Sequence, residues 1–181
     1  MAQLKTADQM LAYCKEHRTT AGTTLNKNKK HFEVIANSLE PGEYALSAFT
    51  GLMDYFNWAF VITNNRIIIG QKKLVGQFIK SVYLDKLNDI TVTAGPIHGF
   101  IEIDTLKEKF KFCVDNKNVD NINSIIHWSI EKQKEYATAK GENSSNQSSL
   151  ADEILKFKHL LDIGAITQEE FDEKKRRLLE L

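Results

Sequence analysis

The side chains best suited to chemistry in this sequence are two cysteines and five histidines. Cys14 and Cys113 lie far apart, and neither belongs to a Cys-x-x-Cys pair, so neither a disulfide framework nor a cysteine zinc site is expected. Cys113 stands in an apolar, strand-like segment, where burial raises the pKa of a thiol and opposes its use as a nucleophile. No two histidines are three or four residues apart, so none can form a metal-binding pair on one helix. We therefore expect inert thiols and no metal site.

The motifs that carry common catalytic or cofactor chemistry are also missing. There is no G-x-G-x-x-G, no P-loop, no H-E-x-x-H and no G-x-S-x-G. The adjacent carboxylates Glu169 and Glu170 fall at the start of an expected helix, where the helix dipole favours acidic side chains. The sequence thus predicts a non-catalytic protein without a cofactor. An enzyme stays the weakest alternative, and it would need a pocket that gathers histidine and carboxylate groups.

The charge balance argues against a nucleic-acid binder. The chain has 181 residues with 24 Lys plus Arg and 24 Asp plus Glu, so its formal net charge is zero. Such a balance gives no long-range attraction to a polyanion, although a local patch remains open. Lys72, Lys73 and Lys80 are the candidate lipid or phosphate patch, and a solvated face is the alternative interpretation.

An unusually apolar turn is the candidate protein-contact site. The segment from 52 to 58 separates two expected strands and contains no Lys or Arg. Its large apolar side chains belong to Met53, Tyr55, Phe56 and Trp58. Aromatic residues and Met are enriched at protein interfaces, so these four residues could anchor a partner. The alternative is that they fold back over the core.

Seven short segments rich in β-branched and aromatic residues predict the strands that position these side chains. The expected strands cover residues 44–49, 58–62, 66–69, 77–83, 90–93, 100–103 and 109–114. Turn residues such as Asn64-Asn65 and Gly95-Pro96 separate several of them. Because no crossover helices fit between the strands, we expect an antiparallel sheet.

Helices are expected on both sides of the strand region. A short helix is predicted over Thr6–His17, with Asp8 favouring its start, then a loop over Arg18–Lys30 and a second helical segment from Phe32 to Leu39. After the strands, apolar residues recur at helical spacing and predict one long amphipathic helix that packs on the sheet. These residues are Val119, Ile122, Ile125, Ile126, Ser129 and Ile130.

The sequence of the last part of the chain predicts a separate helical hairpin. Residues 139–149 are polar and are expected to form a flexible linker. In the hairpin, 150–181, Thr167 and Glu170 have the spacing of a capping box at the second helix. Such a short unit falls below the ~40 residues at which a chain usually folds unaided, so it must dock on its own chain, a copy or another protein. The candidate assembly residues are Ile154, Phe157, Leu161, Phe171 and Leu178.

Three motifs in sequence order resemble the bacterial pleckstrin-homology-like family. They are Leu39-Glu40-Pro41-Gly42-Glu43, Ile62-Thr63-Asn64-Asn65-Arg66-Ile67-Ile68 and Leu84-Asp85-Lys86-Leu87-Asn88-Asp89-Ile90. The resemblance covers roughly residues 32–133. It implies an α+β fold in which an antiparallel sheet or barrel of about seven strands is capped by a C-terminal helix, here preceded by N-terminal helices. The basic residues that eukaryotic members place around the first hairpin are absent from Leu52–Trp58.

The tail resembles the short C-terminal domain that ends many bacterial and phage proteins. The pattern runs from Leu155 to Phe171 and is completed by Lys174-Lys175 and Leu178-Leu179. This resemblance implies oligomerisation or protein binding and names no partner.

Together these observations predict a two-part interaction protein of bacterial or phage origin. The expected division is an N-terminal helical extension over 1–31, a pleckstrin-homology-like domain over 32–138, the linker over 139–149 and the helical hairpin over 150–181. We expect a homo-oligomer with an unidentified protein partner, no nucleic acid, and membrane lipid as a less favoured partner. No signal-peptide core and no membrane-length apolar stretch is visible, so a cytoplasmic location is expected.

Overall fold

The computed structural model describes residues 3–20, 25–162 and 167–178, without the side chains of 25–27, 140–153, 155–156, 162 and 178. The chain divides into two compact units, Met1–Tyr136 and Ala137–Leu181, and each is described by itself. Helix α3 (Val119–Asp162) contributes its first turns to unit 1 and the rest to unit 2.

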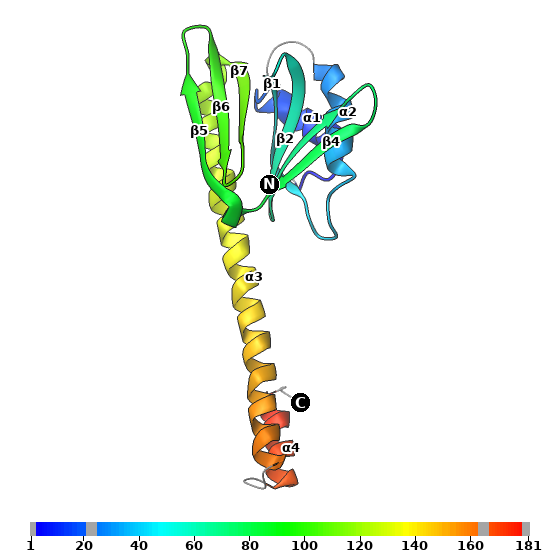
Figure 1. Ribbon diagram of the computed structural model, residues 1–181, viewed down its shortest axis with the longest axis vertical. Helices are drawn as coiled ribbons and strands as arrows, with labels where there is room; N and C mark the ends of the chain where they lie inside the picture. Colours follow the sequence, from blue (N-terminus) through cyan, green and yellow to red (C-terminus); the bar gives the residue numbers. More distant parts are fainter. Residues whose placement is uncertain (1–2, 21–24, 163–166, 179–181) are drawn as a thin grey trace. The chain divides into compact units, whose positions relative to one another are not determined.

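Unit 1 is built on a seven-stranded antiparallel sheet, as predicted (Figure 1). The strands are β1 (Ala45–Met53), β2 (Phe56–Thr63), β3 (Ile67–Lys72), β4 (Gln77–Val82), β5 (Leu87–Ala94), β6 (His98–Thr105) and β7 (Lys109–Asp115). Their order is β4-β3-β2-β1-β7-β6-β5, so β7 returns to the side of β1. The contact between β1 and β7 is short, with Leu52 opposite Cys113, which lets the two halves of the sheet splay apart.

The main core lies between the inner face of the sheet and the first turns of α3. Phe60 stacks between Phe49 and Phe112, with ring centroids 4.7 and 4.9 Å apart. From α3, Ile122 and Ile126 are buried in the same cluster. Val119 is also buried, and Ile125 and Ile130 are partly buried. The predicted apolar face of this helix therefore packs on the sheet, and the α+β architecture is confirmed.

A second apolar layer covers the outer face of β1–β3. Helices α1 (Ala7–Glu16) and α2 (Leu25–Ala36) bury Met10, Cys14, Phe32 and Ile35 against it. Strands β1–β3 are consequently buried on both faces, and nearly all of their successive residues are buried. Along β6 and β7, by contrast, buried and more exposed residues alternate. Gly70 on β3 allows the close approach of α2, because a Cβ there would lie 2.6 Å from Ile35 Cγ1.

Helix α1 starts as expected, with Asp8 in its first turn, and its N-cap is Thr6 in a reciprocal capping box with Gln9. The expectation for the start of the second helix needs correction. Helix α2 begins at Leu25, so the expected loop over Arg18–Lys30 is shorter than predicted. Within α2 the His31 side chain turns toward the sheet, where its Nδ1 accepts a hydrogen bond from the backbone N–H of Lys72 at 2.8 Å.

The structure of unit 2 is helical. Helix α3 runs through residues 139–149, where we expected a flexible linker. This polar segment contains one glycine and no proline, so nothing in it forces the helix to end. Helix α4 (Gln168–Leu178) starts with the predicted capping box: Glu170 N–H donates to Thr167 Oγ1 at 3.3 Å, and Thr167 N–H donates to Glu170 Oε2 at 2.9 Å. Within the described part of the chain, no helix has the length and apolarity needed to cross a membrane.

Candidate functional site

The β1–β2 turn divides the four candidate contact residues into two groups. Asp54 and Tyr55 have φ angles of 51° and 66°, a left-handed pair that suits a tight hairpin. This turn leaves Tyr55 fully exposed and Phe56 66% exposed. Trp58 points inward instead, where its Nε1–H donates to the Met53 carbonyl at 3.1 Å, and Met53 packs partly against the core. Trp58 and Met53 thus fold back over the core, whereas Tyr55 and Phe56 stay exposed.

The β3–β4 turn adds a second pair of exposed apolar side chains, which the sequence analysis did not single out. Leu74 is fully exposed and Val75 is 87% exposed. Gly76 supplies the positive φ of 76° that closes the turn, and its carbonyl accepts from Lys73 N–H at 3.3 Å. The available signal was a Leu-Val pair between two lysines and a glycine, in a segment too short to be a strand. We call Tyr55, Phe56, Leu74 and Val75 the turn surface.

A cavity of about 590 Å³ connects the two turns and reaches α2. Its apolar lining includes Phe56, Trp58 and Leu74. Its basic side chains are those of Lys30, Lys72 and Lys73. Asp54 is the one carboxylate among the described lining residues. His31 also lines it, and burial, followed by the charge of Lys30, lowers the pKa of His31 to about 4, so this side chain is neutral at pH 7. The arrangement suits apolar contact with a partner that carries acidic groups at its edge.

The candidate basic patch is only partly assembled. Lys72 and Lys73 lie together on the cavity wall, where Lys30 from α2 joins them. Lys80 is held elsewhere, because its ammonium group forms an ion pair with Glu108 of the β6–β7 turn. Two of the three predicted lysines therefore contribute to one positively charged region.

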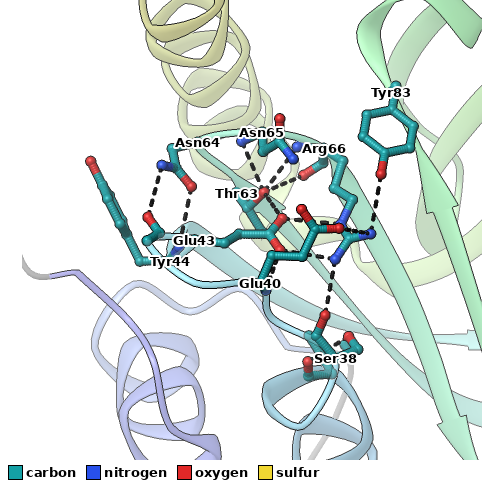
Figure 2. Close-up of polar contacts among 11 residues, drawn as sticks. Ser38, Glu40, Glu43, Tyr44, Thr63, Asn64, Asn65, Arg66 and Tyr83 are labelled. Carbon is teal, nitrogen blue, oxygen red and sulfur yellow. Dashed lines mark hydrogen bonds and ion pairs between the residues drawn. The ribbon is translucent and has the colours of Figure 1, made fainter. Parts of the chain in front are cut away.

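A buried polar network lies within unit 1, and sequence reasoning missed its role (Figure 2). Glu43, before β1, and Arg66, before β3, form a two-pronged ion pair: Arg66 Nε donates to Glu43 Oε1 at 3.1 Å and Nη2 to Oε2 at 2.9 Å. The side chains are only 2% and 10% exposed. Arg66 also donates to the Ser38 carbonyl at 2.9 Å and pairs with Glu40 at 3.0 Å. Burial alone would lower the pKa of Arg66, but the hydrogen bond and charge of Glu43 outweigh it and raise that pKa.

Thr63 is the second centre of this network. Its Oγ1 donates to Glu43 Oε1 at 2.7 Å and accepts from the N–H groups of Asn65 and Arg66 in the β2–β3 turn. Its carbonyl accepts from Gln133 Nε2 on α3 at 2.9 Å. The network therefore joins the segment before β1, the β2–β3 turn and α3. Glu40, Glu43, Thr63, Asn65 and Arg66 belong to two of the motifs described above, so these motifs supply most of the structural network.

Neither cysteine is arranged as a nucleophile. Burial raises the pKa of Cys14 to about 12, and its Sγ donates to the Ala48 carbonyl at 3.3 Å. Burial also raises the pKa of Cys113, which is half-buried on β7. Among the described residues, no group of three or more histidine, cysteine or acidic side chains is placed to hold a metal ion.

The candidate assembly residues of unit 2 keep part of their apolar surface open. Ile154, Phe157 and Leu161 on α3 are half-exposed, as is Phe171 on α4. Lys174 Nζ lies 5.9 Å from the ring centroid of Phe157, a cation–π contact between the two helices. Leu178 ends α4, and its side chain lies outside the described residues. Within the described part of the hairpin, these apolar side chains are therefore only partly buried.

Comparison with known families matches both parts of the chain. The model of the bacterial PH domain matches residues 39–128, and the model of the short C-terminal domain matches residues 152–179. No curated protein matches the sequence. The two family matches confirm the resemblances drawn from the motifs, in the same order. Helices α1 and α2 lie before the first matched residue.

Proposed function

We propose that this chain, a bacterial PH domain followed by a short C-terminal domain, is a non-catalytic interaction and assembly module. In this proposal the turn surface of the PH domain binds a protein partner, and the helical hairpin associates copies of the chain. The domains found are typically non-catalytic. We take the protein to be cytoplasmic and of bacterial or phage origin.

The turn surface carries the binding half of the proposal. The apolar side chains of the turn surface bury little area, so they contribute little to folding, and a partner that covers them would gain the free energy of their burial. Exposed aromatic and aliphatic side chains grouped around a cavity are typical of an interface rather than of a monomer surface. The nearby lysines at 30, 72 and 73 favour a partner with acidic residues around an apolar centre.

The half-exposed apolar residues of unit 2 support the assembly half. Two helices alone expose too much apolar surface to be stable, and pairing hairpins from two copies would cover it. Association through a tail also places several turn surfaces in one particle. Weak individual contacts then act at high effective concentration.

The assembly role is tested by light scattering after size exclusion. The whole chain should be a multimer, and Phe171→Asp should lower its mass because a charge at this half-exposed position opposes apolar association. A chain ending at Lys140, which keeps the complete core of unit 1, should also be smaller than the multimer. A multimer mass that stays unchanged in both variants would contradict the assembly role of the hairpin.

The binding role is tested by comparing two exposed turns. Phe56→Ser combined with Leu74→Ser should abolish retention of partner proteins in pull-downs from a bacterial lysate, while thermal stability stays unchanged. Ile97→Ser is the matched control, because Ile97 is 76% exposed on the separate β5–β6 turn. Equal loss in both variants would show non-specific apolar adhesion instead.

A membrane-surface adaptor is the second candidate, favoured by the lysines that border the turn surface. Vesicles that contain phosphatidylserine should then pellet the protein better than phosphatidylcholine vesicles, and binding should fall as salt rises. Lys72→Glu with Lys73→Glu should remove this binding. Binding that ignores lipid charge and salt would rule this candidate out.

A further inference from the structure

A second cavity of unit 1 lies between α1 and the first turns of α3. Its volume is about 610 Å³, and apolar side chains dominate its lining. The floor is formed by Leu4 and by Leu46 of β1. The helical walls are formed by Gln9, Ala12, Tyr13, Glu16, His17, Ser124, Ile125 and Trp128. We call this cavity the α1–α3 groove.

The geometry of the groove suits a helix. On α1 the lining residues at 9, 12, 13 and 16 fall on one face, and on α3 those at 124, 125 and 128 do the same. Helical walls over an apolar floor are a setting in which an amphipathic helix docks. Ala12 has the smallest side chain of the α1 wall and is exposed, so a docked helix can approach closely there.

Local contacts hold the groove open in the free chain. Asn121 Nδ2 of α3 donates to the His17 carbonyl at the end of α1 at 2.6 Å, which ties the two walls together. The rings of Tyr13 and His17 are 4.1 Å apart. Burial, followed by the charges of Cys14 and Glu16, raises the pKa of Tyr13 to about 12, so its hydroxyl stays neutral. A preformed groove requires little rearrangement when it is filled.

The charge of the lining narrows the choice of occupant. Among the described residues that line the groove, Glu16 is the only carboxylate, and none is a lysine or an arginine. A fitting helix should therefore present an apolar side chain beside a cation. Helix α4 has this pattern: Phe171 is half-exposed, and Lys174, Lys175, Arg176 and Arg177 follow it within two turns, all exposed.

We propose that the α1–α3 groove binds helix α4 of a second copy of this chain. Phe171 would occupy the apolar part near Trp128 and Ile125, and Lys175, one turn further along α4, would approach Glu16. The inference rests on the proposed assembly function and deepens it, since it replaces pairing between hairpins by docking of each tail into a neighbouring PH domain. It also assigns a role to α1, which lies before the matched PH domain and forms one wall of the groove.

The test uses full-length variants in light scattering and sedimentation at several concentrations. Ala12→Arg fills the groove and should weaken association about tenfold or more, as Phe171→Asp does. Glu16→Lys and Lys175→Glu should each weaken it, and the double variant Glu16→Lys/Lys175→Glu should recover part of the loss. Lys15→Glu is the matched control on α1, because Lys15 does not line the groove, and it should associate like the wild type.

Fluorescence quenching by acrylamide gives a second, independent readout. Trp58 is buried, so quenching reports mainly on the partly exposed Trp128. Quenching should fall as the chain associates and stay high in Phe171→Asp. Circular dichroism and thermal melts identify any variant that fails to fold. In that case the concentration dependence of Trp128 quenching in the wild-type chain tests the proposal.

The outcomes separate the inference from the function on which it rests. If Phe171→Asp dissociates the multimer while Ala12→Arg and Trp128 quenching stay unchanged, hairpins pair with each other, and the inference is wrong although the assembly function stands. If the wild type is monomeric at every concentration, both are wrong. Protection of Trp128 that is independent of concentration would assign the groove to the tail of the same chain and would overturn docking between copies.

Discussion

Replacement of Arg66 by methionine should destabilise unit 1 by about 3 kcal/mol. The substitution keeps an apolar stem but removes the guanidinium, so Glu43, only 2% exposed, loses donors at 3.1 and 2.9 Å. Breaking a buried ion pair by removing one partner costs roughly 3–5 kcal/mol, because the other charge stays buried. The lower end applies here, since Thr63 Oγ1 and the Glu40 N–H still donate to the Glu43 carboxylate.

Urea unfolding followed by circular dichroism measures this loss. With a slope of about 1–3 kcal/mol per molar urea, the midpoint should fall by about 1–3 M. The double variant Glu43→Gln/Arg66→Met should be less destabilised than the sum of its two single variants, because the second change removes the charge that the first leaves unpaired. A loss below about 1 kcal/mol, or strict additivity, would refute the reasoning, and the motif residues would then need another role.

Three further predictions concern the elements that hold the turns and the groove in place. Ile126→Ala should cost ~2–5 kcal/mol in thermal melts, whereas exposed His127→Ala should cost less than ~0.5 kcal/mol, and equal effects would mean that the packed face of α3 is misassigned. Burial lowers the pKa of His31 from 6.5 to about 4, so its unfolded form binds a proton more readily. Stability should therefore be full above pH 6.5 and fall as pH drops toward 4, by at most ~1.4 kcal/mol per pH unit in urea titrations, and His31→Gln should flatten this dependence. Gly70→Ala should cost ~1–3 kcal/mol because its Cβ would meet Ile35 Cγ1 at 2.6 Å, and the same change should cost less in an Ile35→Ala background, which lacks that Cγ1.

The strands and the capping helix could be predicted because their signals are local. Alternation, β-branched residues and turn pairs such as Asn64-Asn65 report on neighbours a few residues away. The helical spacing of Ile122 and Ile126 likewise predicts which face packs on the sheet. The capping box of α4 needs only Thr167 and Glu170, three residues apart.

The features that could not be predicted depend on partners distant in sequence. Arg66 meets Glu43 only after β1 and β2 have paired, so no window of sequence contains the network. The hydrogen bond that ties α2 to the end of β3 joins His31 and Lys72, which are 41 residues apart. The four aromatic or apolar residues of the first turn have similar sequence character, yet Trp58 is buried and Tyr55 is fully exposed, and only the register of the hairpin decides between them.

The backbone of the β1–β2 turn lowers folding stability at the residues that the proposed function assigns to binding. Asp54 and Tyr55 both adopt left-handed φ angles, which cost a residue with a side chain roughly 1 kcal/mol relative to glycine. Glycine at position 55 would relieve that cost, yet the chain carries a fully exposed tyrosine there. Tyr55→Gly should therefore raise the melting temperature while it removes an aromatic anchor from the turn surface. Under the proposed function, Tyr55 gives up this folding stability and keeps an aromatic side chain available to a partner.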